Sequence, residues 1–206
     1  MTDREAYYVT NIGTAFKGNT SITHFEEFEY FTGLKTIPNE AFNGCTKLKS
    51  FKIPKGVTTI NYRAFYNVGT NGSATTPEIV IPDTVTTIGN DAFRASTKIQ
   101  RIVVPRSVTS IGSNAFVGIK TFCWDSPVNP NGTGDGAASA GDATSFTSNY
   151  YTVVDGMLVD GTKLFASPIK KTNAYIPNGI VTIGDHAFIS SSTSGTIIIP
   201  EGVQNI

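Results

Sequence analysis

Apolar and polar residues alternate along this chain in a pattern that recurs at nearly fixed spacing. Each copy has an apolar triplet that ends at a proline, then a Val-Thr-x-Ile stretch and an Ala-Phe pair. Successive prolines are 28, 23, 72 and 23 residues apart, so the basic step is 23 residues. A fixed period in this range predicts a solenoid of stacked coils. The prolines are Pro54, Pro82, Pro105, Pro177 and Pro200.

The triplets predict short β-strands. Alternation along a strand sends the two outer residues of each triplet inward and the middle residue outward. Proline has no N–H to donate, so it ends the strand and forces a turn. The middle residues therefore form a predicted exposed row along one face, which makes them the candidate ligand-binding residues. These are Lys52, Val80, Val103, Tyr175 and Ile198.

The Ala-Phe pairs predict the interior of the solenoid. The small alanine leaves room for the ring beside it, and the repeat should stack these rings into a ladder. The ladder is expected at Phe42, Phe65, Phe93, Phe116 and Phe188.

Glycine or asparagine follows the Val-Thr-x-Ile stretch in each copy. Gly89, Gly112 and Gly184 occupy this place, and Asn61 occupies it in an earlier copy. These residue types tolerate positive φ better than others, so the pattern predicts a bend with positive φ at this position.

Departures from the period divide the chain. Residues 1–31 are expected to be an N-terminal capping segment with one or two helical or 3₁₀ turns, because apolar residues recur there about every third position. Residues 32–206 form the predicted solenoid, whose last repeat is truncated. Within it, 66–77 should be a short loop, and Gly-rich 125–149 a flexible loop with almost nothing to bury. Residues 150–173 contain two Asp-Gly turns and predict a hairpin unit.

Composition and charge limit the classes of partner that this chain is expected to bind. Lys and Arg number 16 and Asp and Glu number 16, so no excess of positive charge favours nucleic acid. No apolar run approaches the ~18 residues of a spanning helix, so no membrane insertion is expected. The N-terminal residues do not have the pattern of a signal peptide. Cys45 and Cys123 lie about three coils apart, too far for a disulfide, and are expected to be buried thiols.

No pattern in the chain predicts catalysis or a cofactor. His24 and His186 are the only histidines, and both are expected to be solvated or locally hydrogen-bonded. No group of residues has zinc-ligand spacing. Asp155 and Asp160 each precede glycine, which favours turns over a calcium loop because apolar residues occupy the alternate ligand positions.

The repeated pattern Φ-x-Φ-Pro-x-x-Val-Thr-x-Ile-Gly-x-x-Ala-Phe resembles the BspA-type class of leucine-rich repeats. The resemblance covers most of 32–124 and 174–206. It implies a right-handed, mostly β solenoid with short turns and little helix. It also implies a secreted or surface-displayed bacterial protein that adheres to host matrix proteins, host cells or other bacteria, and it transfers no catalytic residues.

These observations lead to the hypothesis of a non-catalytic, surface-exposed binding module whose partner is a host or bacterial surface protein or glycan. Tyr62, Tyr66 and Trp124, outside the predicted ladder, are further candidates for ligand contact. The alternatives are a structural spacer without a ligand of its own, and an enzyme. The exposed apolar row also has a plainer explanation, since Val and Ile simply favour strands, or the long loop could fold back to cover them.

Overall fold

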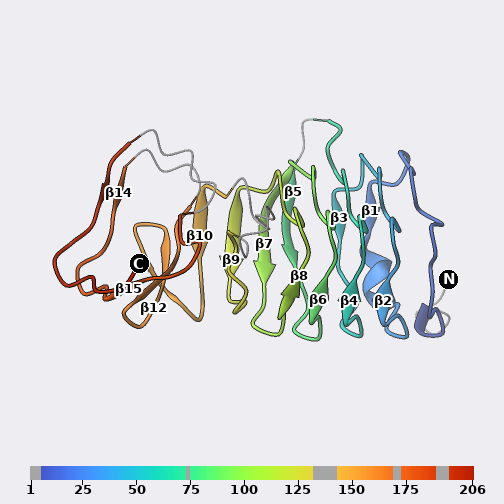
Figure 1. Ribbon diagram of the computed structural model, residues 1–206. Helices are drawn as coiled ribbons and strands as arrows, with labels where there is room; N and C mark the ends of the chain where they lie inside the picture. The colour runs from blue at the N-terminus through green and yellow to red at the C-terminus, as the bar shows by residue number, and fades with distance from the viewer. Residues whose placement is uncertain (1–5, 73–74, 132–142, 169–172, 189–194) are drawn as a thin grey trace.

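The computed structural model describes residues 6–72, 75–131, 143–168, 173–188 and 195–206. It is a β-solenoid of about seven turns with almost no helix, which confirms the predicted fold class. Figure 1 shows the coils stacked side by side from the N-terminal to the C-terminal end of the molecule.

Two faces of the solenoid carry parallel strands. We call the first the strand face; it contains the proline-ending triplets of residues 51–53, 79–81 and 102–104 and has the order β1-β3 and, separately, β10-β9-β7-β5. We call the second the threonine face; it has the unbroken order β2-β4-β6-β8. The strand face consists of β1 (His24–Phe25), β3 (Ser50–Phe51), β5 (Thr76–Val80), β7 (Ile99–Val104), β9 (Thr121–Trp124) and β10 (Ser145–Thr147). The threonine face consists of β2 (Thr36–Ile37), β4 (Thr59–Ile60), β6 (Thr87–Ile88) and β8 (Ser110–Ile111).

The triplets alternate as predicted in the regular coils. Phe51 and Ile53 are buried while Lys52 between them is exposed, and Ile79 and Ile81 are likewise buried on either side of exposed Val80. The last triplet differs, because residues 197–199 are all exposed.

The Ala-Phe turns form the core ladder up to Phe116. The ring centroids of Phe42, Phe65, Phe93 and Phe116 are 5.2, 5.0 and 5.5 Å apart in sequence, with interplanar angles of 3°, 11° and 15°. The backbone supports this stacking, since the Phe42, Phe65 and Phe93 amides each donate to the alanine carbonyl of the next coil at 2.7–2.8 Å. The ladder does not extend to Phe188, so that expectation is wrong. Phe188 packs against a separate apolar cluster.

The glycines of the threonine face are required for a different reason than predicted. Gly89, Gly112 and Gly184 do not have positive φ. A Cβ on Gly89 would lie 2.8 Å from the Asn61 carbonyl carbon, and one on Gly112 would lie 2.4 Å from the Asn90 nitrogen. Close approach to the preceding coil therefore requires glycine here. The positive φ occurs two residues later, at Arg63 (51°), Asp91 (56°), Asn114 (56°) and His186 (60°).

The Gly-rich segment carries part of the solenoid. Its residues 132–142 lie outside the described residues, so the expectation of a flexible loop there stays a prediction. Its C-terminal flank, expected to bury almost nothing, instead contains β10, which pairs in parallel with β9, and Phe146 is buried at its centre. On the other flank, Asn131 is buried and its side-chain amide donates to the carbonyls of Ser167 and Ala187 at 3.1 and 2.9 Å. These flanks join the first coils to the later ones.

The predicted meander of hairpins follows. Strands β11 (Thr152–Val154), β12 (Met157–Asp160) and β13 (Lys163–Ala166) are antiparallel, and β13 then pairs in parallel with β15 (Thr182–Ile183). The last described pair is β14 (Ala174–Tyr175) with β16 (Ile197–Ile198), also parallel. This part has its own apolar cluster, formed by Met157, Val159, Leu164, Ile176, Ile180, Ile183 and Ala187.

The N-terminal end of the ladder is covered by aromatic rings. The predicted short turn is present as the 3₁₀ helix η1 (Glu26–Tyr30). It places the Phe28 ring edge-on to Phe42, with centroids 5.0 Å apart, and Phe16 stacks on Phe42 at 5.1 Å. The assignment of 1–31 as a separate capping unit remains a prediction.

Both cysteines are free and buried. The Cys45 thiol donates to the Phe16 carbonyl at 2.9 Å, and burial raises its pKa to about 11. Cys123 lies on the strand face beside Thr147 and Asn149, with its sulfur 3.4 Å from the Asn149 side-chain amide.

Candidate binding groove

The strand face is broken between β3 and β5, although the same coils are joined without a break on the threonine face. Where neighbouring triplets pair, Ile81 donates its amide to the Val103 carbonyl at 3.1 Å, and Ile176 donates to Ile198 at 3.1 Å. The equivalent hydrogen bond, from Ile53 to the Val80 carbonyl, is not formed. The coil between them is the one with a 28-residue step, and its extra residues enter shortly before β5. These residues let β5 move away from β3. The threonine face and the stacked Ala-Phe turns keep the spacing of the other coils.

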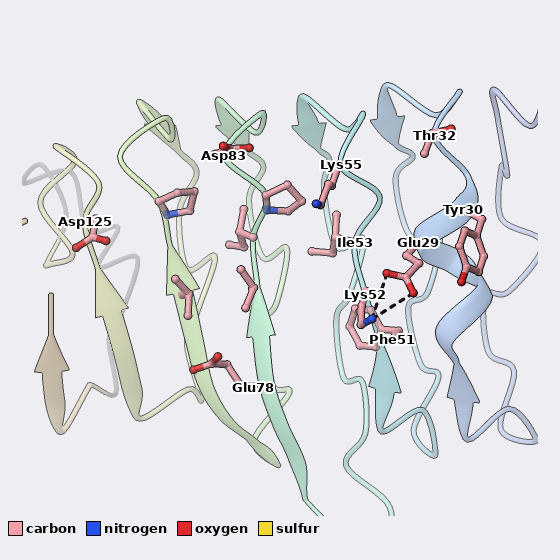
Figure 2. Close-up of a pocket in the computed structure, with 15 residues that line it drawn as sticks. Glu29, Tyr30, Thr32, Phe51, Lys52, Ile53, Lys55, Glu78, Asp83 and Asp125 are labelled. Carbon is pink, nitrogen blue, oxygen red and sulfur yellow. Dashed lines mark hydrogen bonds and ion pairs between the residues drawn. The ribbon is translucent and has the colours of Figure 1, made fainter. Parts of the chain in front are cut away.

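A groove of about 640 Å³ lies at this break. Its lining is contributed by η1 and by the triplets and turns of the following coils, as Figure 2 shows. Apolar side chains and prolines make up most of it, and charged side chains stand around them. The apolar lining includes Tyr30, Ile53, Val80, Pro82, Val103 and Pro105, and the charged lining consists of Glu29, Lys52, Lys55, Glu78, Asp83 and Asp125.

Three of the five predicted site residues meet in the groove. Lys52, Val80 and Val103 all line it, and Val80 is 55% exposed, which is unusual for a valine in a strand. Tyr175 and Ile198 do not line it. They are paired in register on β14 and β16, in the later part of the chain. The structure therefore divides the predicted row into two separate surfaces.

Two ion pairs neutralise charged side chains beside the groove, one between Lys52, directly after β3, and η1 and one between β5 and β7. Lys52 Nζ lies 3.2 Å from Glu29 on η1, and its pKa is raised because Glu29 hydrogen-bonds to the ammonium group and attracts its charge. Arg101 lies 3.3 Å from Glu78, its partner across β5 and β7, and also donates to Thr147 at 3.1 Å. These four charged groups compensate one another.

Asp125 is held by neutral donors at the far end of the groove. Its carboxylate accepts hydrogen bonds from the Ser148 hydroxyl at 2.6 Å and from the amides of Asn149 and Tyr150 at 2.7 and 3.1 Å. Burial alone would raise the pKa of Asp125, but these hydrogen bonds outweigh it and hold the pKa below its usual value. The carboxylate is therefore charged at neutral pH and has no cation paired with it among the described residues.

The other aromatic candidates do not contribute to the groove. Trp124 is fully buried, and its indole N–H donates to the Val128 carbonyl at 2.9 Å, so its proposed role as a ligand contact is wrong. Tyr62 and Tyr66 flank the Arg63 guanidinium at 4.9 and 5.0 Å from their ring centroids. They lie on the Ala-Phe turns and do not line the groove.

Sequence reasoning missed the residues that surround the predicted row. Tyr30 comes from η1, and its neighbourhood depends on how η1 folds against β3, which no repeat predicts. Asp83 and Lys55 each follow a repeat proline, so their common position in the repeat is a signal that could have identified them. Asp125 lies two coils beyond Asp83 only because β9 continues the sheet.

The histidines take no part in the groove. His24 is exposed and lies 2.9 Å from the Thr23 hydroxyl, while the backbone carbonyl of His186 accepts a long hydrogen bond from Asn131. In the part of the chain that the structure describes, no three His, Cys, Asp or Glu side chains are grouped so that they could hold a metal ion.

A model of the BspA-type leucine-rich repeat region matches residues 10–121 and 160–206 in six copies. The chain belongs to this BspA-type family. The matched residues of this BspA-type chain include all that line the groove except Asp125. The segment between the matches contains β10, β11, most of β12 and the Asn131 contacts. Comparison with curated proteins finds no match.

Comparison with solved structures finds leucine-rich repeat and cell-surface proteins similar to this BspA-type chain. A leucine-rich repeat protein of T. pallidum is 24% identical, with a TM-score of 0.52 over 68% of this chain and 64% of that one. A leucine-rich cell surface protein of Faecalibacterium prausnitzii is 23% identical, with a TM-score of 0.48 over 84% of this chain and 54% of that one. The pneumococcal vaccine antigen PcpA is 19% identical, with a TM-score of 0.49 over 84% of this chain and 44% of that one. The chain thus spans less than two thirds of these relatives. Among its described residues, no helix is both long and apolar enough to cross a bilayer.

Proposed function

We propose that this chain is a non-catalytic protein-binding module of a secreted or cell-surface bacterial protein, and that it adheres to a host or bacterial surface protein through the groove. The observation that carries the proposal is the groove itself, where the exposed Val80 and half-buried Val103 lie beside a break in the sheet. Apolar side chains held in the open on a rigid sheet lose little conformational freedom when a partner covers them.

The family supports this proposal. Repeat solenoids present broad, preformed surfaces that suit macromolecular partners. The F. prausnitzii relative is named a cell surface protein, and PcpA is named a vaccine antigen. These names describe those proteins, and they support surface display of this chain as part of the proposal.

The test is binding of the purified chain to an array of extracellular-matrix proteins, glycans and bacterial surface proteins. Wild type should give a saturable signal that the double variant Val80→Lys/Val103→Lys abolishes, because two ammonium groups would stand in the apolar part of the groove. A matched control is Thr86→Lys/Thr109→Lys, which adds the same charge at exposed positions of the threonine-face coils and should bind like wild type.

Each outcome decides between hypotheses. A signal that survives the groove variant would place the site elsewhere and overturn the groove assignment. The absence of any signal from a folded protein would contradict adhesion and favour the structural spacer. A signal only from glycans would contradict a protein partner.

A further inference from the structure

We infer that the groove binds an extended peptide segment of its partner, with a lysine or arginine of that segment placed on the half of the rim that carries Asp83 and Asp125. The inference rests on the proposed function, since it names the chemistry of the ligand that the groove takes. It follows from the groove's length, its unpaired backbone groups and its uneven charge.

The groove has the dimensions of a short extended segment. Its lining comes from five consecutive coils, beginning at η1 and ending at Asp125. Four steps between coils at about 4.8 Å give roughly 19 Å. An extended chain advances about 3.3 Å per residue, so roughly six residues would span the groove. In the close-up, Tyr30 and Asp125 mark its two ends (Figure 2).

The break in the sheet leaves backbone groups for a ligand. Among the residues that the structure describes, no backbone carbonyl accepts from the Ile53 N–H, and the Val80 carbonyl lacks the amide that the equivalent Val103 carbonyl accepts. Both residues line the groove. An extended segment that crosses the break offers a backbone carbonyl for the Ile53 N–H and a backbone amide for the Val80 carbonyl.

The charges around the groove are unevenly distributed. Glu29 and Glu78 are matched by Lys52 and Arg101, as described above. Asp83 is exposed and takes part in none of the ion pairs of the described residues. Asp83 stands on the third of the five coils and Asp125 on the fifth, so two lining carboxylates outside these ion pairs lie on one half of the rim.

Among the residues that line the groove, Lys55 is the one cation outside these ion pairs. Arg106, in the turn between Asp83 and Asp125, does not line the groove, and its guanidinium carbon lies 3.6 Å from the centroid of the Tyr150 ring. Lys55 is exposed, and Figure 2 shows it between Thr32 and Asp83, with Asp125 farther along the same rim. A segment with a basic residue toward Asp125 and an acidic residue toward Thr32 would therefore match the rim, with apolar side chains between them over Val80 and Val103.

The experiment is selection of a displayed library of random 12-residue peptides on the intact chain, with Val80→Lys/Val103→Lys protein used to remove peptides that bind elsewhere. Enriched peptides are then synthesised and their affinities measured by fluorescence anisotropy. The expected sequences carry Lys or Arg a few residues from two or more apolar residues. Asp83→Asn should weaken their binding by up to about fivefold, and Asp83→Lys by about tenfold.

A charge exchange provides the decisive control. Replacing the basic residue of the peptide by glutamate should abolish the preference for wild type and restore binding to Asp83→Lys. Thr109→Lys, which adds the same charge on another face, should leave every affinity unchanged. Rescue by the exchange would show direct pairing, because loss of folding cannot produce it.

Three results would overturn the inference. They are enrichment of peptides without a basic residue, insensitivity of the enriched peptides to Asp83→Lys, and failure of any peptide to enrich against the groove variant. None of them decides the proposed function, which the array of intact proteins tests independently: groove-dependent binding of a folded protein without peptide binding would keep the function and reject the extended segment.

Discussion

The two sheets of this solenoid are built by the same coils but respond differently to the same insertion. On the threonine face, β4 and β6 stay in register, with Thr59 opposite Thr87 and Ile60 opposite Ile88, although 28 residues separate them. On the strand face, the corresponding strands β3 and β5 do not pair with each other. The threonine face has its strands directly before the Ala-Phe turn, whose ring stacking fixes the coil spacing. Strand β5 follows the inserted residues in the chain, so the ring stacking at the preceding Ala-Phe turn does not fix its distance from β3.

This difference shows how a repeat protein can gain a site without losing its core. The Phe65 and Phe93 rings stack 5.0 Å apart across the insertion, as closely as rings elsewhere in the ladder. Because the insertion separates strands on one face only, the groove forms with the loss of a few backbone hydrogen bonds between β3 and β5 and without loss of aromatic stacking in the ladder.

Removing a ring from the ladder should disturb both faces and have the largest effect. Phe93 is fully buried between Phe65 and Phe116. Phe93→Ala should lower the free energy of unfolding by about 3–5 kcal/mol, since the cavity lies in a rigid stack. Urea denaturation monitored by circular dichroism measures the change. Phe93→Leu, which keeps most of the volume, should cost distinctly less, and an equal loss in both variants would contradict a role for ring stacking.

A Cβ at a glycine of the threonine face should disturb that face alone. In Gly89→Ala, the methyl group would meet the backbone of Asn61 and Tyr62 at 2.8 Å, so the coils must separate there. We expect a loss of about 1–3 kcal/mol in the free energy of unfolding. The matched control is Asn61→Ala, at the same repeat position in a coil that already accommodates a Cβ. Its stability should stay within about 0.5 kcal/mol of wild type.

Protonation of Asp125 should weaken the end of the strand face. Its folded-state pKa is lowered, so its stabilisation is complete above the unfolded-state value of about 3.9 and is lost as the pH falls through the lower folded-state pKa. At neutral pH, Asp125→Asn should cost about 1–2 kcal/mol, because the amide accepts the Ser148, Asn149 and Tyr150 hydrogen bonds more weakly.

The pH dependence separates this effect from a general acid sensitivity. The difference in unfolding free energy between wild type and Asp125→Asn should stay constant from pH 8 to about pH 5 and shrink below about pH 4. Urea titrations at each pH measure it. A difference that grows on acidification would contradict the lowered pKa.

The parts of the fold that repeat were predictable because their spacing carries the information. The Val80 triplet could be assigned an inward and an outward side from alternation alone, and Phe93 could be assigned to the ladder from its distance to Pro82. Phe188 occupies the same place in the repeat but fails to join the ladder, because β10 and the hairpins separate its coil from Phe116. Periodicity predicts the environment of a residue only while consecutive coils stack.

The rest depends on contacts that no local pattern encodes. Phe146 is a single apolar residue in a Gly-rich segment, and only its register with Phe122 makes it part of the core. Prediction of the groove likewise required knowledge of the face on which the insertion separates the strands, and the repeat pattern does not contain it. The row containing Val80 and Val103 was predictable as an exposed row, whereas the addition of Tyr30, Asp83 and Asp125 to it was not.

Amide hydrogen exchange resolved by NMR distinguishes a strand face that is open between β3 and β5 from a continuous one. Ile53 and Ile81 occupy the same position in consecutive repeats, and both side chains are buried. Only Ile81 donates its amide to the next coil. The Ile53 amide should therefore exchange at least about tenfold faster than that of Ile81, while the Gly89 and Gly112 amides of the threonine face both remain protected. Equal protection of Ile53 and Ile81 would mean that the sheet is continuous and would contradict the groove on which the proposed function rests.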